Sequence, residues 1–517
     1  MTLKILFKNA RFAAVELEDG GVYDMEKTWK IFVNGKLYKE TSRVINMIYG
    51  LEPETEYEIR ADHGDETACV TCKTDYEYVT MNVRDFGAKG DGVSDDTHFI
   101  QAAVMACPRE SRVLIPSGVY RISTLFLKDH LNLELEKGAV LKAFTEREKF
   151  PVFQGTIPGN RSEEEMLLGT WEGDSQAMFS GIICGVRVND VTIYGEGVVD
   201  GNASHKNWWE NPKDIKIAAR PRMIFLNQCE NIVVAGITVQ NSPSWNVHPY
   251  FSRHLQFIGM QILGPKDSPN TDGLDPESCK DVRITGVYFS VGDDCIAVKS
   301  GKIAVGSKYK TPSEDIIIRQ CCMRDGHGSI TLGSEMAAGV KNLKAMNCKF
   351  LNTDRGLRIK TRRGRGKDAV IDNILFEDIV MDHVMTPFVI NCFYFCDPDG
   401  KTDYVQCKKA LPVDERTPAV KKLTFKNIKA DNCHVAAAFF YGLPEQKIEE
   451  INMEHVRVTY AKEAKAGKPA MMNGVSDEIK KMGIYANNIK KLTLCDVNIQ
   501  GADSEAIHTE NVDKVVR

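Results

Sequence analysis

Short segments with apolar residues at alternating positions recur along the chain from about residue 112 onward. They stand near Ile232, Leu255, Val282, Ile316, Leu343, Ile374, Leu423, Ile451 and Leu492. Most intervals run from about 23 to 34 residues, a period typical of solenoids. Asn or Asp precedes several of these units, as turn residues do. Leucine-rich repeats would also need a long segment with a 3.6-residue period, and we find none. The pattern predicts an all-β chain folded mainly as a right-handed parallel β-helix.

The first 77 residues have a different pattern and are predicted to form a small separate β-sandwich. Alternating runs at 29–33 and 57–61 are separated by turn signals, one of them Asn34-Gly35, which favours a hairpin. The segment from Gly50 to Tyr57 resembles the E–F corner of fibronectin type III domains, in which a Tyr packs beneath the turn. We expect a spacer or docking module without chemistry of its own.

Residues 78–517 are predicted to form the β-helix domain, closed at its start by a helix. This helix should begin at about Thr97, capped by Asp95 or Asp96. Its apolar face is expected to hold Phe99, Ile100, Ala103 and Val104. An uncovered end would expose both the apolar core and an unpaired strand edge. Two longer stretches, 142–180 and 393–420, interrupt the repeat and are interpreted as loops walling a substrate groove.

Composition and charge narrow the class of protein. The net charge is -5, so no overall positive field favours nucleic acid. We find neither a signal-peptide-like apolar region nor a run long enough to cross a membrane. The fifteen Cys residues are odd in number and scattered, which favours reduced thiols and a cytoplasmic protein. A leader removed from the chain would instead indicate secretion. Cys69 and Cys72 have the spacing of one ligand pair but lack a second pair, so no metal site is predicted.

Four short motifs lie between residues 270 and 360. They are Asn270-Thr271-Asp272, Gly292-Asp293-Asp294, Gly326-His327-Gly328 and Arg358-Ile359-Lys360. Neighbouring strands of stacked coils lie about 4.8 Å apart. Stacking would therefore gather three carboxylates, an imidazole and two cations into one patch.

Such a patch has the chemistry that glycoside hydrolysis needs. Clustered carboxylates repel one another, so at least one keeps its proton to a higher pH than a free Asp. The protonated group can serve the leaving oxygen while an ionised partner activates water. Each motif alone also has a plainer interpretation: a surface turn or calcium site for the Asp pair, a turn histidine for His327, and solvated charges for Arg358 and Lys360.

Taken together and in this order, the motifs resemble the hallmark set of the polygalacturonases, glycoside hydrolase family 28. Residues 85–92 and 241–245 are also similar to plant and bacterial members, and the resemblance covers roughly residues 83–500. It implies inverting hydrolysis of α-1,4-galacturonosyl bonds, with Asp293 as general acid. It further implies that Asp272 and Asp294 position the water and that His327 supports the acid. No cofactor and no metal are implied.

Cationic groups near the motifs are candidates for binding the uronate carboxylates. Arg358 and Lys360 share one strand face and would bind the sugar that flanks the scissile bond. The basic loop after them adds Arg363. Its lack of interleaved aromatic residues argues against nucleic acid. Further candidates for substrate contact are Asn270, Lys299 and His248, for which core or loop packing is the alternative.

Several alternatives stay open. Exo action is preferred, because long loops can close one end of a groove and a cytoplasmic enzyme would meet imported oligogalacturonides. The sandwich also resembles the arrangement in some bacterial exo-acting members. The alternatives are an endo-polygalacturonase, a rhamnogalacturonan or xylogalacturonan hydrolase, a calcium-dependent pectate lyase, and a β-helix that binds polysaccharide without cleaving it. No membrane or nucleic-acid partner is expected, and the sequence does not indicate an oligomeric state.

Overall fold

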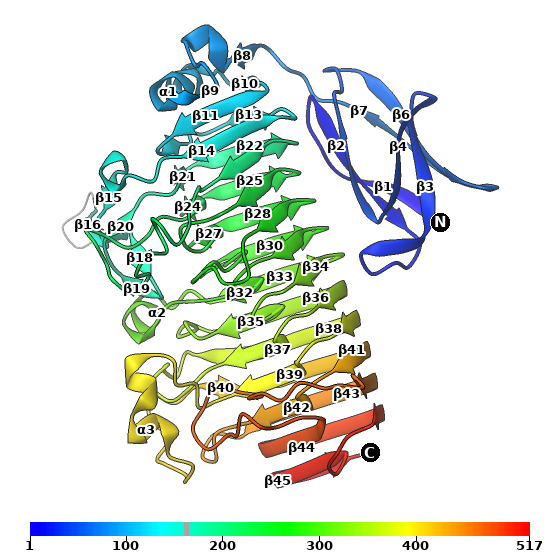
Figure 1. Cartoon of the computed structure of the whole chain (residues 1–517), viewed down its shortest axis with the longest axis vertical. Helices are drawn as coiled ribbons and strands as arrows, with labels where there is room; N and C mark the ends of the chain where they lie inside the picture. Colours follow the sequence, from blue (N-terminus) through cyan, green and yellow to red (C-terminus); the bar gives the residue numbers. More distant parts are fainter. Residues whose placement is uncertain (160–164) are drawn as a thin grey trace.

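The computed structural model describes residues 1–159 and 165–517 (Figure 1). It begins with two antiparallel sheets that pack into a small sandwich. The first has the order β1 (Thr2–Lys8), β2 (Phe12–Glu18), β5 (Ile45–Tyr49). The second has the order β4 (Lys36–Arg43), β3 (Asp24–Val33), β6 (Glu56–His63), β7 (Glu66–Lys73). Leu17, Trp29, Ile31 and Ile59 belong to its apolar core.

The predicted tyrosine corner has a matching contact in this sandwich. The Tyr57 hydroxyl accepts a hydrogen bond from the Glu52 N–H at 2.8 Å, so the ring is tied to the turn that precedes it. Asn34 and Gly35 form the predicted hairpin turn between β3 and β4, both with positive φ. The likeness to fibronectin type III domains stays a prediction.

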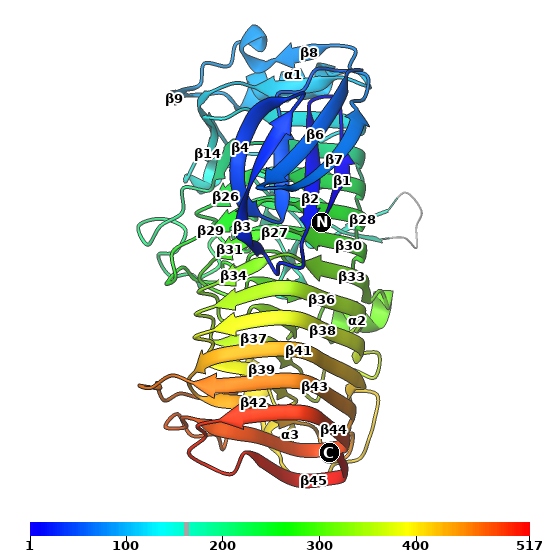
Figure 2. The ribbon, with the colours of Figure 1, turned by 90° about the vertical axis from the view of Figure 1, so that its right-hand side faces the viewer.

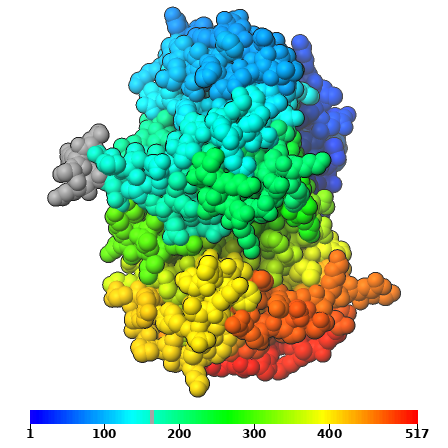
Figure 3. Space-filling model, turned by 60° about the vertical axis from the view of Figure 1, so that its left-hand side comes forward, coloured from blue at the N-terminus to red at the C-terminus, as the bar shows by residue number. Residues whose placement is uncertain are grey.

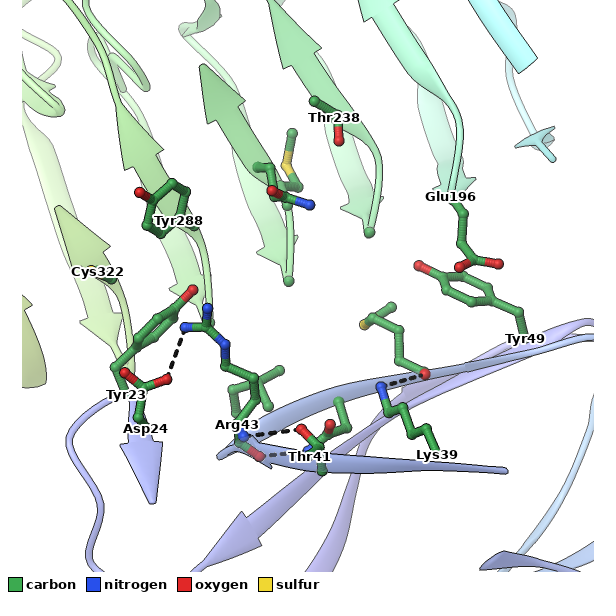
Figure 4. Close-up of a pocket in the computed structure, with 18 of the residues that line it drawn as sticks. Tyr23, Asp24, Lys39, Thr41, Arg43, Tyr49, Glu196, Thr238, Tyr288 and Cys322 are labelled. Atoms are coloured by element: carbon green, nitrogen blue, oxygen red, sulfur yellow. Dashed lines mark hydrogen bonds and ion pairs between the residues drawn. The ribbon is translucent and has the colours of Figure 1, made fainter. Parts of the chain in front are cut away.

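The sandwich rests against the flank of the β-helix (Figures 1 and 2). The Phe12 ring stacks on Tyr194 with centroids 4.7 Å apart, and the Tyr49 hydroxyl donates to the Gly195 carbonyl at 3.0 Å. Arg319 pairs with buried Glu16. Beside these contacts lies a polar crevice of about 1040 Å³, shown in Figure 4. The apolar contact and the ion pair together hold the sandwich in place.

A helix closes the start of the coil. After β8 (Thr80–Asn82), η1 (Val83–Phe86) and β9 (Asp91–Asp95), helix α1 runs over Thr97–Ala106. The Asp95 carboxylate accepts from the Thr97 N–H at 3.2 Å. Ile100, Ala103 and Val104 are buried in the β-helix core as predicted. Phe99 is 39% exposed, because its ring turns outward against Gly87, so its predicted place in the apolar face was wrong.

Three parallel ladders of strands form the coil, a right-handed parallel β-helix in keeping with the usual hand of parallel crossovers. The first ladder consists of β8, β10 (Arg112–Ile115), β13 (Leu131–Leu135), β22 (Asn189–Gly195), β25 (Glu230–Ala235), β28 (Arg253–Ile258), β30 (Lys280–Thr285), β33 (Ser313–Arg319), β36 (Val340–Leu351), β38 (Val370–Asp382), β41 (Lys422–Cys433), β43 (Ile448–Tyr460), β44 (Met482–Gln500) and β45 (Ile507–Val516). The second consists of β9, β11 (Gly118–Ile122), β14 (Ala139–Ala143), β23 (Val198–Asp200), β26 (Thr238–Gln240), β29 (Gln261–Leu263), β31 (Tyr288–Ser290) and β34 (Cys322–Arg324), and then continues in the later part of β36.

The third ladder carries the candidate site. It runs through β12 (Leu125–Phe126), β21 (Ile183–Val186), β24 (Ile224–Asn227), β27 (Val247–Tyr250), the bridge residue Leu274, β32 (Ile296–Val298), β35 (Ile330–Gly333), β37 (Arg355–Lys360), β39 (Thr386–Asn391), β42 (Ala436–Tyr441) and the start of β44.

The apolar repeat predicted the register of the first ladder. Each of its nine positions, from Ile232 to Leu492, is paired directly with the next. The residues before the apolar positions adopt positive φ, as at Asp281 and Asn342, which lie near the start of β30 and β36. The side-chain amide of Asn373 donates to Asn342 one coil away at 2.8 Å. One alternating apolar pattern therefore determines the register of the coils along the first ladder.

Insertions project from the side of the coil opposite the sandwich (Figure 1). The first contains η2 (Arg147–Lys149), β15 (Val152–Phe153), β16 (Thr156–Pro158), β17 (Glu165–Leu167), β18 (Thr170–Trp171), β19 (Asp174–Ser175) and β20 (Met178–Phe179). Later ones contain α2 (Ile303–Tyr309), η3 (Pro398–Lys401) and α3 (Asp403–Gln406). The short strand β40 (Ala419–Val420) follows them and pairs with the start of β38 in the first ladder. No helix in the described ranges is long and apolar enough to cross a membrane.

Candidate active site

Backbone hydrogen bonds between coils place the four motifs on successive rungs. The Gly273 N–H donates to the Asp294 carbonyl at 2.9 Å, and the Cys295 N–H donates to the Gly328 carbonyl at 2.8 Å. The Ser329 N–H then donates to the Arg355 carbonyl at 2.8 Å. Segments more than eighty residues apart in sequence thus share one edge of the third ladder.

A cleft of about 500 Å³ opens over these rungs. Seven of the ten predicted site residues line it: Asn270, Asp272, Asp293, Lys299, His327, Arg358 and Lys360. Figure 3 turns this side partly forward, with the segment near residue 400 in yellow and the loop near 470 in orange below the first insertion. Glu172 of the first insertion and Tyr394, Cys396 and Asp397 of the second contribute to the walls, as does Met471. Both predicted insertions therefore border the cleft.

Two glycines allow the rungs to approach closely at His327. A Cβ on Gly328 would lie 2.6 Å from Asp294 Oδ1, and one on Gly326 would lie 2.6 Å from the Asp293 carbonyl oxygen. Neither distance is tolerable for a side chain. The glycines of this motif therefore let the carboxylates and the imidazole share one site.

The three carboxylates converge closely, yet their surroundings differ. One oxygen each from Asp272, Asp293 and Asp294 lies within 4.8 Å of the others. Burial raises the pKa of Asp272 to about 7, against the opposing charge of Lys299. Asp294 is fully buried, but the ammonium of Lys360 at 2.8 Å and the guanidinium of Arg358 at 2.9 Å outweigh burial and hold its pKa well below the usual value. Burial therefore lets Asp272 keep its proton to a higher pH than a free Asp, whereas Asp294 is ionised across the neutral range.

His327 is held on the other side of Asp293. Its Nδ1 lies 2.7 Å from Asp354 Oδ2, and its backbone N–H donates to the backbone carbonyl of Asp293 at 3.1 Å. The hydrogen bond to Asp354 raises the pKa of His327, although burial opposes it, and the charge of Asp293 adds to the rise. The imidazole is therefore poised to carry a positive charge beside the acid cluster.

Lys299 links the cleft to a buried polar network. Its ammonium lies 3.3 Å from Asp272 and 3.4 Å from Glu335, and it sits 4.1 Å from the centre of the Trp245 ring. Arg222 belongs to the same network, and its guanidinium lies 4.4 Å from the centre of the Trp245 ring. Trp245 therefore makes cation–π contacts with two cations, which stabilise its position.

Three predicted residues lie elsewhere. Asp294 is buried beneath the floor of the cleft, where its carboxylate accepts hydrogen bonds from Arg358 and Lys360. Arg363 points into the body of the protein, with Glu445 at 2.6 Å, because the loop that follows β37 turns inward. His248 is fully buried, with Nε2 2.9 Å from Glu277, and burial lowers its pKa well below the usual value. Substrate contact by Arg363 or His248 was a wrong prediction for this structure.

Other residues of the cleft escaped sequence reasoning. Asp354 and Arg355 directly precede the Arg358 motif, and their charges at the entry to a strand were an available signal. Glu172, Glu335 and Tyr394 lie in insertions or turns, and the apolar repeat does not predict where such residues lie in the fold.

The oxygen donors of the three Asp residues would fit a hard cation such as Ca²⁺. In this structure Asp272 is contacted by Lys299, and Asp294 by Arg358 and Lys360, which neutralise much of the charge of these two carboxylates. Bound metal would have to displace these ammonium and guanidinium groups. The arrangement is better suited to proton transfer than to cation binding.

Sequence and structure comparisons relate this chain to known proteins. A sequence profile described as Glycosyl hydrolases family 28 matches residues 156–476, and one described as Rhamnogalacturonase A/epimerase, pectate lyase-like matches residues 80–154. A probable polygalacturonase of Vitis vinifera is 30% identical over 408 residues, which cover 77% of each chain. The exo-poly-alpha-D-galacturonosidase of Dickeya chrysanthemi is 24% identical over 435 residues, covering 74% of this chain and 69% of the relative.

Two solved structures share the architecture. The family 28 exopolygalacturonase of Yersinia enterocolitica superposes with a TM-score of 0.72 at 20% identity, covering 99% of this chain and 98% of that one. A hyperthermoactive exopolygalacturonase of Thermotoga maritima superposes with a TM-score of 0.65 at 25% identity, covering 82% and 93%. With the profile matching more than half of its length and the acid cluster assembled on the β-helix, the chain belongs to family 28 of the glycosyl hydrolases, the polygalacturonase family.

Proposed function

We propose that this protein hydrolyses α-1,4-galacturonosyl bonds from one end of oligogalacturonides or polygalacturonate. The observation that carries the reaction is the convergence of three carboxylates, His327 and the Arg358–Lys360 pair around one cleft. Support for exo action comes from the insertions that wall this cleft and from the exo-acting relative of Dickeya chrysanthemi.

In the proposed mechanism, the proton retained by the cluster is what cleaves the bond. The free protein holds it on Asp272. On substrate binding it passes to Asp293, which then gives it to the leaving glycosidic oxygen. Asp272, now ionised, accepts a proton from the attacking water, so the charge balances over the reaction. The charge on His327 stabilises the ionised form of Asp293 after transfer. Asp294 keeps Arg358 and Lys360 facing the substrate.

The stereochemical outcome is proposed to be inversion. That expectation comes from the family resemblance. Carboxyl groups of inverting glycosidases are usually about 6.5–9.5 Å apart. Oxygens of this cluster come within 4.8 Å of one another, a closer spacing. Inversion here requires the water to be held at the edge of the Asp272 and Asp293 carboxylates rather than between them. Proton NMR of the first anomer released from trigalacturonate distinguishes the two outcomes.

We further propose that the protein acts in a reducing compartment, where it meets imported oligosaccharides. All fifteen thiols are free, and most are buried. Disulfides are rare in such compartments.

A product time-course on trigalacturonate and polygalacturonate tests this function. Galacturonate as the only short product of polygalacturonate from the first minute supports exo hydrolysis, with digalacturonate as the other product of the trimer, whereas a mixture of oligomers from polygalacturonate indicates endo action. Products that absorb as unsaturated uronates, lost on adding a chelator, would indicate a calcium-dependent lyase. Binding without new reducing ends would indicate a non-catalytic protein. Rhamnogalacturonan and xylogalacturonan serve as competing substrates, and faster cleavage of either would change the substrate assignment.

A further inference from the structure

The cations of the cleft differ in how far neighbouring carboxylates neutralise them. Arg358 and Lys360 both contact Asp294, at 2.9 and 2.8 Å. Lys299 lies within 3.4 Å of both Asp272 and Glu335. These three groups therefore already have anionic partners in the free protein.

Arg355 is less well neutralised than any of these three. It opens β37, lines the cleft, and keeps 12% of its side chain exposed. Within the described residues, its closest carboxylate oxygen belongs to Asp354 at 3.5 Å. That same oxygen makes the 2.7 Å contact with His327. The charge of Asp354 is thus shared with a closer partner.

The position of Arg355 is nevertheless fixed. Its Nη2 donates to the Lys468 carbonyl at 2.7 Å, which ties the guanidinium to the loop between β43 and β44. A guanidinium has five N–H donors in one plane, and the recorded hydrogen bonds of Arg355 use two of its nitrogens. Burial and the neighbouring charge of Arg358 lower the pKa of Arg355 to about 10. An anion placed in the cleft would offset this repulsion by its opposite charge.

The rung spacing locates this group relative to the chemistry. Arg355 lies one rung beyond Gly328 and two beyond Asp294. Two rungs span about 10 Å along the coil, farther than one sugar ring extends, and the Arg355 side chain lines the same cleft. Arg355 is therefore placed to meet a sugar beside the scissile bond rather than the bond itself.

We propose that Arg355 is a substrate-binding residue that takes the carboxylate of a galacturonate unit next to the cleavage point, beside His327. This inference rests on the proposed function of the cleft. A guanidinium fork matches a carboxylate bidentately, and the match is lost when the acid is esterified or reduced. Arg355 would thus select free uronates over their methyl esters at that position.

Binding measurements with matched ligands test the inference. Trigalacturonate and its methyl ester are titrated by calorimetry into the Asp293→Asn protein, with and without Arg355→Met. We expect Arg355→Met to weaken trigalacturonate binding by about 10- to 100-fold and to leave the ester unchanged. Lys213→Met is the matched control, since it removes one exposed cation from the rim of the same cleft and should have a much smaller effect.

The proposal is overturned if Arg355→Met weakens the binding of trigalacturonate and of its methyl ester to the same extent, or weakens neither. Thermal unfolding reports whether losing the bond to Lys468 disturbs the fold. If Arg355→Met is unstable, Arg355→Lys keeps the charge without the fork and should lose affinity for the acid only. Wild-type release of reducing ends from polygalacturonate is measured alongside. Its absence would reject the proposed function, whereas normal release with unaffected Arg355→Met binding would reject this inference alone.

Discussion

Two neighbouring groups of cations are used in opposite ways. Arg358 and Lys360 lie on β37 and line the cleft, whereas Arg362, Arg363 and Arg365 follow shortly after, do not line it and are almost completely buried. The buried group pairs with Asp397, Asp399 and Glu445. It fastens the segment near residue 400 that walls the cleft. The comparison teaches that charge indicates a function only once the partner of each charge is known.

The largest expected effect concerns the carboxylate that faces the cleft. Asp293→Asn should lower kcat by at least about 1000-fold while substrate binding and the fold are retained, because the leaving oxygen loses its proton donor. An aryl galacturonide with an acidic leaving group should be cleaved by Asp293→Asn but not by Asp272→Asn, since only the first lacks the acid. Rescue of Asp272→Asn alone would reverse the two roles.

Asp294 should matter more for stability than the other members of the cluster. Asp294→Asn leaves Arg358 and Lys360 without their buried partner and should cost about 3–5 kcal/mol of unfolding free energy. Since its folded pKa is depressed, Asp294 stabilises the protein above the ordinary Asp pKa of about 4, and this contribution is lost as the pH falls. Chemical denaturation at neutral and acid pH measures it. Equal stability of Asp294→Asn and wild type would contradict the pairing.

Substitution of a buried arginine tests the other group of cations in this comparison. Arg363→Met should also lose about 3–5 kcal/mol, because Glu445 is left buried without its partner. Lys367→Met, which removes an exposed charge of the same loop, should change stability by less than about 1 kcal/mol. If Arg363→Met instead left stability intact and selectively weakened galacturonide binding, the division between the two groups would fail.

Lys360→Ala should weaken binding of galacturonides more than that of neutral sugars. Its ammonium lines the cleft, although Asp294 already contacts it. A carboxylate of the substrate would share this charge, so the expected loss is about 5- to 20-fold. Inhibition by galacturonate and by galactose, compared at constant ionic strength, measures the difference. Equal losses for the two sugars would exclude carboxylate recognition by Lys360.

The smallest effect is expected on the pH profile. The hydrogen bond from Asp354 raises the pKa of His327, so the imidazolium persists to higher pH. Asp354→Asn removes that contribution and should move the alkaline limb of kcat/KM to lower pH. The contribution of this pair to stability is present while Asp354 is ionised and His327 is protonated, so it is lost as the pH rises through the folded pKa of His327 and also as the pH falls through the lowered pKa of Asp354. If the alkaline limb of kcat/KM does not move, the ionisation of His327 does not control the reaction.

Much of the fold could be predicted because one alternating apolar pattern repeats on every coil. Val282, Ile316 and Leu343 mark the same place in successive turns, and the register follows from them. Site residues next to such strands, including Asp272 and His327, could be predicted for the same reason. Arg363 could not, because its direction depends on Glu445, more than eighty residues later. The burial of His248 likewise depends on its partner Glu277.

The most direct test of the account is cleavage of polygalacturonate in water enriched in heavy oxygen, with a chelator present. The account predicts that wild type releases galacturonate carrying the heavy oxygen at its anomeric carbon and that Asp293→Asn releases almost none. Unlabelled products with an unsaturated ring, or equal release by the two proteins, would contradict it.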